Sequence, residues 1–529
     1  MRVWKASCPS AHRTIHIVSG PLEQRVARIL WVIALLTMAF VATWPLIGGM
    51  IAVNDDIKFV RVPAHQEPLV RQITDMWSGS PAFRPLEVIV AASCDERTLR
   101  APLAIPLQWI GLAGLCAAIV PLSRRIFPGR AWVAPLAILW VALSPGTSCS
   151  VWQIDTVSQT WSAALGLWAI EVAWRALDAA RNGRSTLVSC TILGCIFALG
   201  VNVKETFYGW SAGVGLALIG ATAWLLVRDR RAALRLGWTL FPVVALPVAH
   251  LALRWMTGSM SRSLELKQEN RYQLEFGMNL LINAAQSTAG AVGTGPFHGL
   301  SNEAAPLLVR VLPLLTLVAE ACLLAIMLEF VVLRRARGQR GFVWPAVLIC
   351  VIGLLSLSVT FPMGSVSELY GFGANACVAL LLAAAFTAIC QEARSRTIRW
   401  VSIALMGFAM LAGAIGLSGR ASHFERTWRV TRSVNQQILA FMDTRPEAPK
   451  YFDAPQSTIY FPADCRPSRS HGSYIMPAAQ AIDIINTVEW MKRLHPRYPV
   501  TFSIDQDAPN PNPYELQIDC SGAADVGNW

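Results

Sequence analysis

Long apolar runs alternate with short polar connections over most of the chain. A helix needs about 20 mostly apolar residues to cross the hydrocarbon core of a bilayer. We find about eleven runs of this kind, at residues 28–50, 102–122, 131–149, 158–176, 186–203, 207–227, 237–256, 305–333, 343–361, 371–390 and 400–418. The pattern predicts an all-α polytopic membrane protein with about 11 transmembrane helices.

Arginine residues gather in every second connection between these runs. The arginine-rich connections lie at residues 124–130, 175–184, 228–235, 334–340 and 394–399. By the positive-inside rule these connections face the cytoplasm, together with the basic N-terminal segment 1–27. The remaining connections then face outward, and the C-terminus lies opposite the N-terminus. We expect a multi-pass protein of a bacterial inner membrane, with its outer loops in the periplasm.

Composition excludes a soluble enzyme. Of the 529 residues, 54% are hydrophobic and only 15% are charged, whereas an average soluble domain has about 25% charged residues. The net charge of +12 does not predict a nucleic-acid partner, because the basic residues are spread over many small groups instead of one face. The lipid bilayer is the expected partner. The sequence contains no motif typical of a structural metal site.

The segment 421–529 differs from the rest because it lacks long apolar runs. Residues 457–461 and 500–504 have the composition of short strands, and residues 478–494 have helical spacing of apolar positions. We expect a small α+β periplasmic domain. Its two cysteines, Cys465 and Cys520, are candidates for a disulfide in an oxidising compartment, although two unpaired thiols remain the alternative.

Polar residues are concentrated in the predicted outer loops instead of at the bilayer midplane. A transporter usually places ionisable groups within its spans, and here these groups are few: Glu320, Glu329, His250 and Arg254. The long outer loop 51–101 begins with Asn54-Asp55-Asp56. Asp55 and Asp56 are candidates for a general base or a cation site, because neighbouring carboxylates raise one pKa. The alternative is a solvated helix cap.

Other candidates lie in the remaining outward segments. Arg84 lies between two prolines later in the first loop, and Lys204-Glu205 ends one span with almost no loop before the next. A lysine is a good phosphate-binding point charge, whereas an interfacial ion pair is the alternative interpretation. The loop 257–304 carries cations that could attract an anionic lipid. The further candidates in these segments are Arg271, His298, Gln153, Asp155, Glu368 and Tyr370.

The order of these motifs resembles the GT-C superfamily of integral-membrane glycosyltransferases, which includes protein O-mannosyltransferases and lipid A aminoarabinose transferases. The resemblance covers roughly residues 28–420. It consists of Asn54-Asp55-Asp56, the Phe83-Arg84-Pro85-Leu86 element, Lys204-Glu205, and Ser367-Glu368-Leu369-Tyr370. The last element is similar to a Ser-Glu-Arg-Tyr type, with Leu369 in place of arginine.

The resemblance implies that a sugar moves from a polyprenyl-phosphate donor to a periplasmic glycan, lipid or protein acceptor. In that case Asp55 or Asp56 acts as general base. Lys204 and Arg84, with Arg271 and His298 from loop 257–304, contact the donor phosphate. Glu205 orients Lys204 or holds an acceptor hydroxyl, and Glu368, Tyr370, Asp155 and Gln153 line the cavity. We predict no cofactor, although adjacent carboxylates permit a divalent cation.

Two other functions fit the sequence less well. The first is a transporter or flippase for lipid-linked saccharides, which requires polar groups through the midplane. The second is a non-catalytic assembly subunit. A subunit of this kind does not explain why both the acidic pair and Lys204-Glu205 are present.

Overall fold

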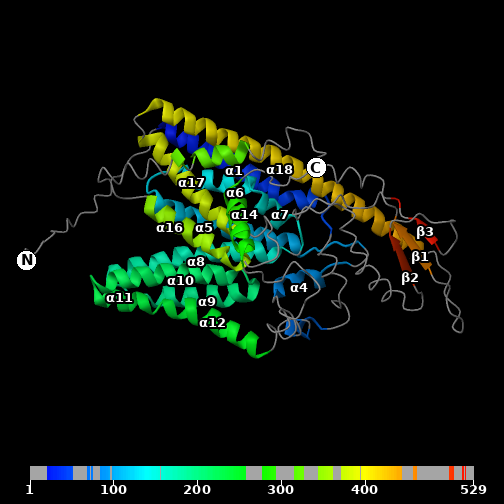
Figure 1. Cartoon of the computed structure of the whole chain (residues 1–529), viewed down its shortest axis with the longest axis horizontal. Coiled ribbons are helices and arrows are strands. Elements are labelled where there is room, and N and C mark those ends of the chain that lie inside the picture. The colour runs from blue at the N-terminus through cyan, green and yellow to red at the C-terminus, as the bar shows by residue number, and fades with distance from the viewer. Residues whose placement is uncertain are drawn as a thin grey trace, which may run out of the picture.

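The computed structural model describes residues 21–51, 68–71, 73–74, 84–95, 98–154, 156–257, 277–293, 315–323, 325–326, 343–361, 371–392, 395–443, 457–461, 500–504, 515–517 and 519. This part of the chain is mostly helical (Figure 1). Its main helices are α1 (Pro21–Ile47), α4 (Pro85–Ala92), α5 (Ala104–Ile126), α6 (Val133–Leu143), α7 (Pro145–Val151), α8 (Val157–Arg181), α9 (Leu187–Val203), α10 (Phe207–Leu226), α11 (Arg230–Gly237), α12 (Leu240–Met256), α14 (Met278–Val292), α16 (Val343–Ser356), α17 (Phe372–Glu392) and α18 (Arg396–Asp443).

Most of the described helices lie where the apolar runs predict them, whereas α4, α11 and α14 lie in predicted connections. The number of membrane spans is not fixed at eleven. Six of the described helices are long and apolar enough to cross a membrane, or seven if the bent pair α6–α7 counts as one span. Two others, α9 and α16, are apolar but have only 17 and 14 residues. The chain is therefore a membrane protein with several transmembrane helices.

The predicted run 131–149 is a broken helix instead of a continuous one. Helices α6 and α7 meet at an angle of 67°. The break occurs at Ser144, which is extended (φ −64°, ψ 139°) and precedes Pro145. A proline disfavours the helical conformation in the residue before it and lacks the N–H that would continue the helix. Arg420 of α18 donates hydrogen bonds to the Leu143 carbonyl (3.0 Å) and to Ser148 Oγ (2.7 Å) on either side of the break.

The helices are packed around α17, which is almost completely buried. It contacts α6, α8, α16 and α18. In Figure 1 most of the helices lie roughly along the long axis, with α1 and α18 along one edge and α12 along the other, whereas α14 runs across it. Because α8 is 25 residues long, it spans about 37 Å between the two ends of the bundle.

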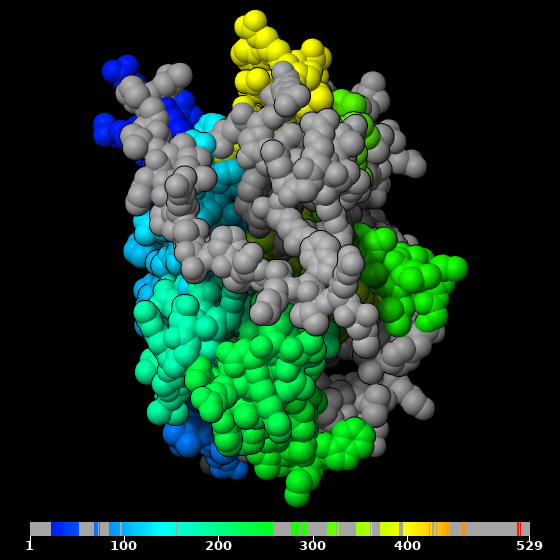
Figure 2. Space-filling view, turned by 90° about the vertical axis from the view of Figure 1, so that its left-hand side faces the viewer, coloured from blue at the N-terminus to red at the C-terminus, as the bar shows by residue number. Residues whose placement is uncertain are grey.

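The two ends of the bundle differ in charge. At one end lie the connections that carry Arg124 and Arg125, Arg181 and Arg184, and α11 with its arginines. We call it the arginine-rich end. Figure 2 looks onto this end, with α10–α12 in green and the start of α18 in yellow. Arg125 is paired there with Glu171 (2.6 Å) and Asp178 (2.7 Å), and the short helix α4 lies at the opposite end (Figure 1).

Helix α18 is longer than the predicted span 400–418. Its 48 residues extend about 72 Å, and the expected domain boundary at residue 421 falls inside it. Beyond that boundary Arg432 Nη2 donates to the Gly49 carbonyl (2.6 Å), and Trp44 Nε1 donates to the Ala421 carbonyl (3.2 Å). The first turns beyond residue 420 therefore belong to the helical bundle.

A three-stranded parallel sheet lies near the far end of α18 (Figure 1). Its strands are β1 (Ser457–Phe461), β2 (Val500–Ile504) and β3 (Glu515–Gln517), in the order β2-β1-β3. The first two strands confirm the sequence prediction, whereas β3 was not predicted. Gln437 of α18 exchanges hydrogen bonds with the backbone of Asp519, which ties the sheet to the helix. The segment 478–494 lies outside the described residues.

Helices α10 and α16 approach each other closely through glycines. A Cβ at Gly209 would lie 2.4 Å from the Ser356 carbonyl oxygen, and one at Gly213 would lie 2.9 Å from the Ile352 carbonyl oxygen. Small residues at this four-residue spacing let backbones of membrane helices come into contact. By contrast, a Cβ at Gly220 on the same helix would meet no other atom within 4 Å.

We predict opposite effects for two alanine substitutions in α10. Gly209→Ala forces the two helices apart, and overpacking of this kind costs about 1–3 kcal/mol. Gly220→Ala is the matched control, and it should leave the protein equally or slightly more stable because alanine is the better helix former. The thermal unfolding midpoint of the purified protein in detergent measures both. Equal midpoints for the two variants would contradict the close contact.

Candidate functional site

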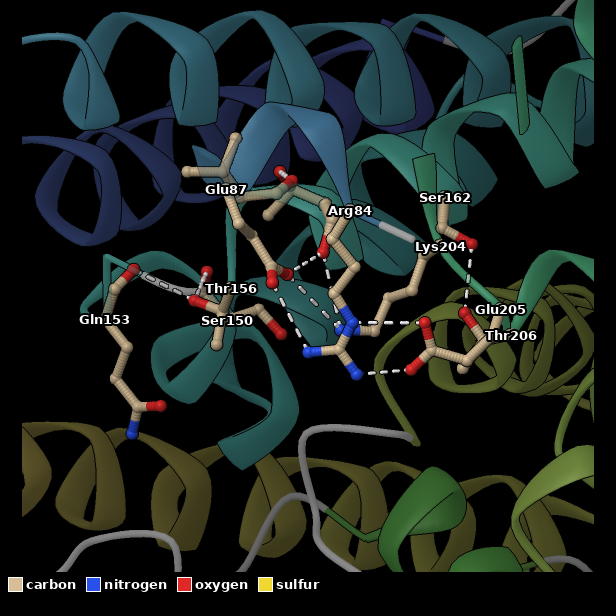
Figure 3. Close-up of polar contacts among 12 residues, drawn as sticks. Arg84, Glu87, Ser150, Gln153, Thr156, Ser162, Lys204, Glu205 and Thr206 are labelled. Carbon is tan, nitrogen blue, oxygen red and sulfur yellow. Dashed lines mark hydrogen bonds and ion pairs between the residues drawn. The ribbon is translucent and has the colours of Figure 1, made fainter. Parts of the chain in front are cut away.

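Four helix ends meet at the end of the bundle opposite the arginine-rich end. They are the start of α4, the start of α8, the end of α9 and the start of α10 (Figure 3). Each contributes a charged or hydroxyl side chain. These residues, Arg84, Glu87, Ser158, Lys204 and Glu205, are called the charged cluster below.

Arg84 and Glu87 are placed by the proline that starts α4. Pro85 occupies the first helical position, where its missing N–H costs nothing. It keeps Arg84 out of the helical conformation (φ −135°, ψ 68°). Glu87 lies in the first turn, three residues after Arg84, and its side chain is buried. Arg84 Nη1 donates to Glu87 Oε2 at 3.3 Å.

Lys204 and Glu205 lie in the tight turn between α9 and α10. Lys204 ends α9 in an extended conformation (φ −158°, ψ 143°), and its carbonyl accepts a bond from the Phe207 N–H at 3.0 Å. The turn is compact because Phe207 packs on Gly200, where a Cβ would lie 2.3 Å from the ring. The absence of an intervening loop, predicted from the sequence, is therefore confirmed.

The charged cluster consists of two linked ion pairs. Arg84 binds Glu205 through two nitrogens, with an Nε to Oε2 distance of 3.1 Å. Lys204 Nζ lies 3.8 Å from Glu87 Oε1 and 3.4 Å from Ser158 Oγ. Ser158 in turn donates to Glu87. Glu87 thus connects the two pairs, since it contacts Arg84, Lys204 and Ser158.

Burial differs between the two pairs. Glu87 and Lys204 are 2% and 1% exposed, whereas the side chains of Arg84 and Glu205 are 11% and 32% exposed. Arg84 and Glu205 therefore form the accessible side of the cluster, and Lys204 lies behind them. Glu205 was predicted to orient Lys204 or to hold an acceptor hydroxyl; in the structure it accepts hydrogen bonds from Arg84.

The charge state of Glu205 follows from its neighbours. Burial by itself would raise the pKa of this carboxyl, but the charges of Arg84 and Lys204 and the hydrogen bonds from Arg84 outweigh it and lower the pKa to about 2. Glu205 is therefore a carboxylate at any physiological pH. Such a group is a poor proton donor and a weak base, and it accepts two hydrogen bonds from Arg84.

Two of these residues, Glu87 and Ser158, were not identified as site residues from the sequence. In the sequence Glu87 follows Arg84 by three residues, in the segment Arg84-Pro85-Leu86-Glu87. Side chains three residues apart are neighbours on a helix surface, so this spacing predicts that the two residues can pair. Ser158 has no comparable signal, because only the packing of α8 against α4 brings it to Glu87.

Gln153 lies near the charged cluster without joining it. Its carbonyl accepts bonds from Gln108 Nε2 (2.6 Å) and Thr156 Oγ1 (2.9 Å), and its side chain extends away from Arg84 in Figure 3. The adjacent Trp152 is fully buried, and its Nε1 donates to the Val41 carbonyl at 2.8 Å. This tryptophan is part of the core.

Several predicted site residues lie outside the described residues. They are Asp55, Asp56, Asp155, Arg271, His298, Glu368, Tyr370, Cys465 and Cys520. Of the predicted residues, the structure brings Arg84, Lys204 and Glu205 together and places Gln153 nearby. No group of three potential metal ligands occurs among the described residues.

We predict that the charged cluster is essential for stability. Glu87→Gln removes the negative charge next to Lys204 and Arg84, and breaking a buried ion pair from one side costs about 3–5 kcal/mol. The matched control is Glu425→Gln, because Glu425 pairs with Arg429 on the surface with side chains 36% and 71% exposed. An exposed pair of this kind contributes less than about 1 kcal/mol. Thermal unfolding in detergent compares the two, and an equally small effect at Glu87 would contradict the buried network.

We also predict the pH range in which Glu205 stabilises the protein. Its pKa is lower in the folded state, about 2, than the ordinary value of 4.5, so folding is favoured wherever the unfolded carboxyl is ionised. The advantage of the wild type over Glu205→Gln should be full above about pH 5. It should shrink as the pH falls from 4.5 towards 2. Unfolding midpoints measured across this range test the prediction, and an advantage that grows on acidification would contradict it.

No family model matches the sequence, and no curated protein matches it. Similar solved structures include the Archaeoglobus fulgidus oligosaccharyltransferase AglB with an inhibitory peptide and a dolichol-phosphate, at 13% identity and a TM-score of 0.42, over 91% of this chain and 65% of that one.

Two further structures are of the Archaeoglobus fulgidus oligosaccharyltransferase. The complex with Zn and sulfate has 12% identity and a TM-score of 0.44, over 88% of this chain and 62% of that one. The form tethered to an acceptor peptide has 14% identity and a TM-score of 0.42, over 89% and 63%. The chain thus covers less than two thirds of the length of these structures. The solved structures named here, all similar to this chain at low identity, are of an archaeal oligosaccharyltransferase.

Proposed function

We propose that this protein is a membrane glycosyltransferase that moves a sugar from a polyprenyl-phosphate donor to a periplasmic glycan, lipid or protein acceptor. The observation that supports this most directly is the charged cluster. It gathers Arg84 and Glu87 from the first outer loop with Lys204 and Glu205 from the turn between α9 and α10.

Charged groups buried at the end of a helical bundle are costly to retain in a membrane protein. Such residues usually mark a functional site. A site at one end of the bundle suits chemistry at the membrane surface, since a transport path needs polar groups through the midplane. Its distance from the arginine-rich end agrees with a location on the periplasmic side.

The reaction needs a base for the acceptor and a cation for the leaving phosphate. In the proposed mechanism Asp55 or Asp56 accepts the proton of the acceptor hydroxyl as its oxygen attacks the anomeric carbon. The bond between that carbon and the phosphate oxygen breaks, and the departing polyprenyl phosphate keeps the electron pair. Arg84 belongs to the same outer loop as the two aspartates, and it stabilises the negative charge of the leaving phosphate.

The two cations of the cluster differ in exposure, and we assign them different roles. Arg84 is the direct phosphate contact, because it lies on the accessible side and a guanidinium fits phosphate oxygens well. Lys204 is 1% exposed, so it acts mainly through Glu87 and adds positive charge behind Arg84. Glu205 fixes the guanidinium. Arg271 and His298 are proposed as further donor contacts, and Glu368, Tyr370, Asp155 and Gln153 as cavity residues.

Sugar transfer by the purified full chain tests the proposal. The assay uses a panel of radiolabelled polyprenyl-phosphate sugars with crude periplasmic glycan, lipid and protein as acceptors. Asp55→Asn or Asp56→Asn should lower the transfer rate about 10²- to 10⁴-fold, the usual contribution of a general base, without weakening donor binding. Arg84→Gln should lower both rate and donor affinity.

Asp178→Asn is the matched control, because this aspartate lies at the arginine-rich end, in an ion pair with Arg125. It should transfer sugar at the wild-type rate. Donor binding without turnover, unchanged by all of these substitutions, would contradict a glycosyltransferase and favour a carrier or an assembly subunit.

A further inference from the structure

Two arginines share one tryptophan at the arginine-rich end of the bundle. Trp224 lies in the last turn of α10 and is 43% exposed. The guanidinium carbon of Arg228 lies 4.4 Å from the centre of its ring, and that of Arg181 lies 5.7 Å away. Both distances are typical of cation–π contacts. Arg228 follows the end of α10, whereas Arg181 ends α8, so the tryptophan joins two separate helices.

Positive charge exceeds negative charge around this tryptophan. The segments 178–184 and 228–235 contain six arginines and two aspartates. Asp178 is paired with Arg125 (2.7 Å), and Asp229 accepts hydrogen bonds from two backbone N–H groups at the start of α11 (3.0 Å each). The two guanidinium groups at the ring lie within about 10 Å of each other, a range over which like charges repel at ordinary salt. An anion bound between them relieves this repulsion.

Hydrogen bonds hold the two segments together. Arg235 Nη1 donates to the Ala180 carbonyl at 3.3 Å, and Thr186 Oγ1 donates to the Arg235 carbonyl at 2.7 Å. The connection between α10 and α11 is also tight, since the Asp229 N–H donates to the Leu225 carbonyl at 2.6 Å. The two arginines are therefore carried by a fixed backbone, and a site built on such a backbone loses little conformational freedom when it binds a ligand.

Exposed apolar side chains surround these arginines. Val227 at the end of α10 is 89% exposed, Trp238 after α11 is 71% exposed, and Leu187 at the start of α9 is 70% exposed. Helix α11 faces the viewer in Figure 2. Tryptophan and arginine side chains next to exposed apolar residues are typical of the headgroup level of a membrane. The same surface thus offers cations to a headgroup and apolar side chains to acyl chains.

We propose that Arg181, Trp224 and Arg228 form a binding site for the headgroup of an anionic phospholipid, in the leaflet at the arginine-rich end. A guanidinium has five N–H donors, so it can contact a ring and still donate to phosphate oxygens. Basic pockets of this kind between transmembrane helices bind anionic lipid headgroups. A soluble acidic partner fits less well, because it would leave the exposed apolar side chains in water.

The lipid site is separate from the proposed sugar transfer. Trp224 and the Lys204-Glu205 turn lie at opposite ends of α10, which has 20 residues. That length separates them by about 25–30 Å, so one headgroup does not contact both. The inference therefore does not depend on the glycosyltransferase proposal.

Lipid binding by the purified full chain, measured by native mass spectrometry from detergent, tests the site. The probe is phosphatidylglycerol, and phosphatidylethanolamine with the same acyl chains is the matched ligand without net charge. Arg181→Gln and Arg228→Gln should each weaken phosphatidylglycerol binding about fivefold, the contribution expected of one arginine at an anionic lipid surface. Binding of phosphatidylethanolamine should not change. Trp224→Leu should weaken phosphatidylglycerol binding about twofold to fivefold, because the ring no longer holds the two arginines together.

Arg396→Gln is the matched control, because Arg396 is an exposed arginine at the start of α18, at the same end of the bundle. This variant should bind phosphatidylglycerol as the wild type does. Arg181→Lys combined with Arg228→Lys keeps both charges. It should bind more weakly than the wild type and more tightly than the double glutamine variant, because an ammonium lacks the planar donor set of a guanidinium.

Three outcomes would overturn the proposal. Wild-type affinity in the Arg181 and Arg228 variants would show that these arginines bind no lipid. An equal loss in Arg396→Gln would replace the site with a general attraction between surface charge and anionic lipid. Soluble glycerol phosphate that displaces phosphatidylglycerol at equal concentration would overturn the assignment to a membrane lipid.

Discussion

The pairing of four charges, two of them almost completely buried, holds the charged cluster together. Arg84 and Glu87 come from α4, and Lys204 and Glu205 come from the turn between α9 and α10. An uncompensated charge is costly where water is excluded. The two segments must therefore pack so that their opposite charges pair. The pairing therefore fixes where α4 packs against the turn between α9 and α10.

Glycine contacts and a broken helix place the elements that carry this pairing. Gly200 lets Phe207 close the turn that presents Lys204 and Glu205. Gly209 lets α10 contact the backbone of α16. The break at Ser144 turns the chain so that α8 starts beside α4, where Ser158 reaches Glu87. Small residues and a proline thus determine where these helices lie, and the helices in turn determine where the charged residues lie.

The charged cluster is asymmetric in access. Arg84 and Glu205 are partly exposed, whereas Glu87 and Lys204 are almost completely buried. Glu205 interacts electrostatically with Arg84 and Lys204 of the cluster and with Arg254 of α12. This carboxylate therefore connects the cluster to α12.

The sequence by itself determined the helical architecture, the two ends of the bundle and the strands β1 and β2, because apolar runs, arginine clusters and alternating patterns are local signals. It also singled out Arg84, Lys204 and Glu205, since charges beside apolar runs are conspicuous. Only the tertiary structure decided that Glu205 pairs with Arg84, that Glu87 joins both pairs, and that Arg254 interacts with Glu205. Those contacts link residues distant in the chain, and no local pattern specifies which buried charges meet.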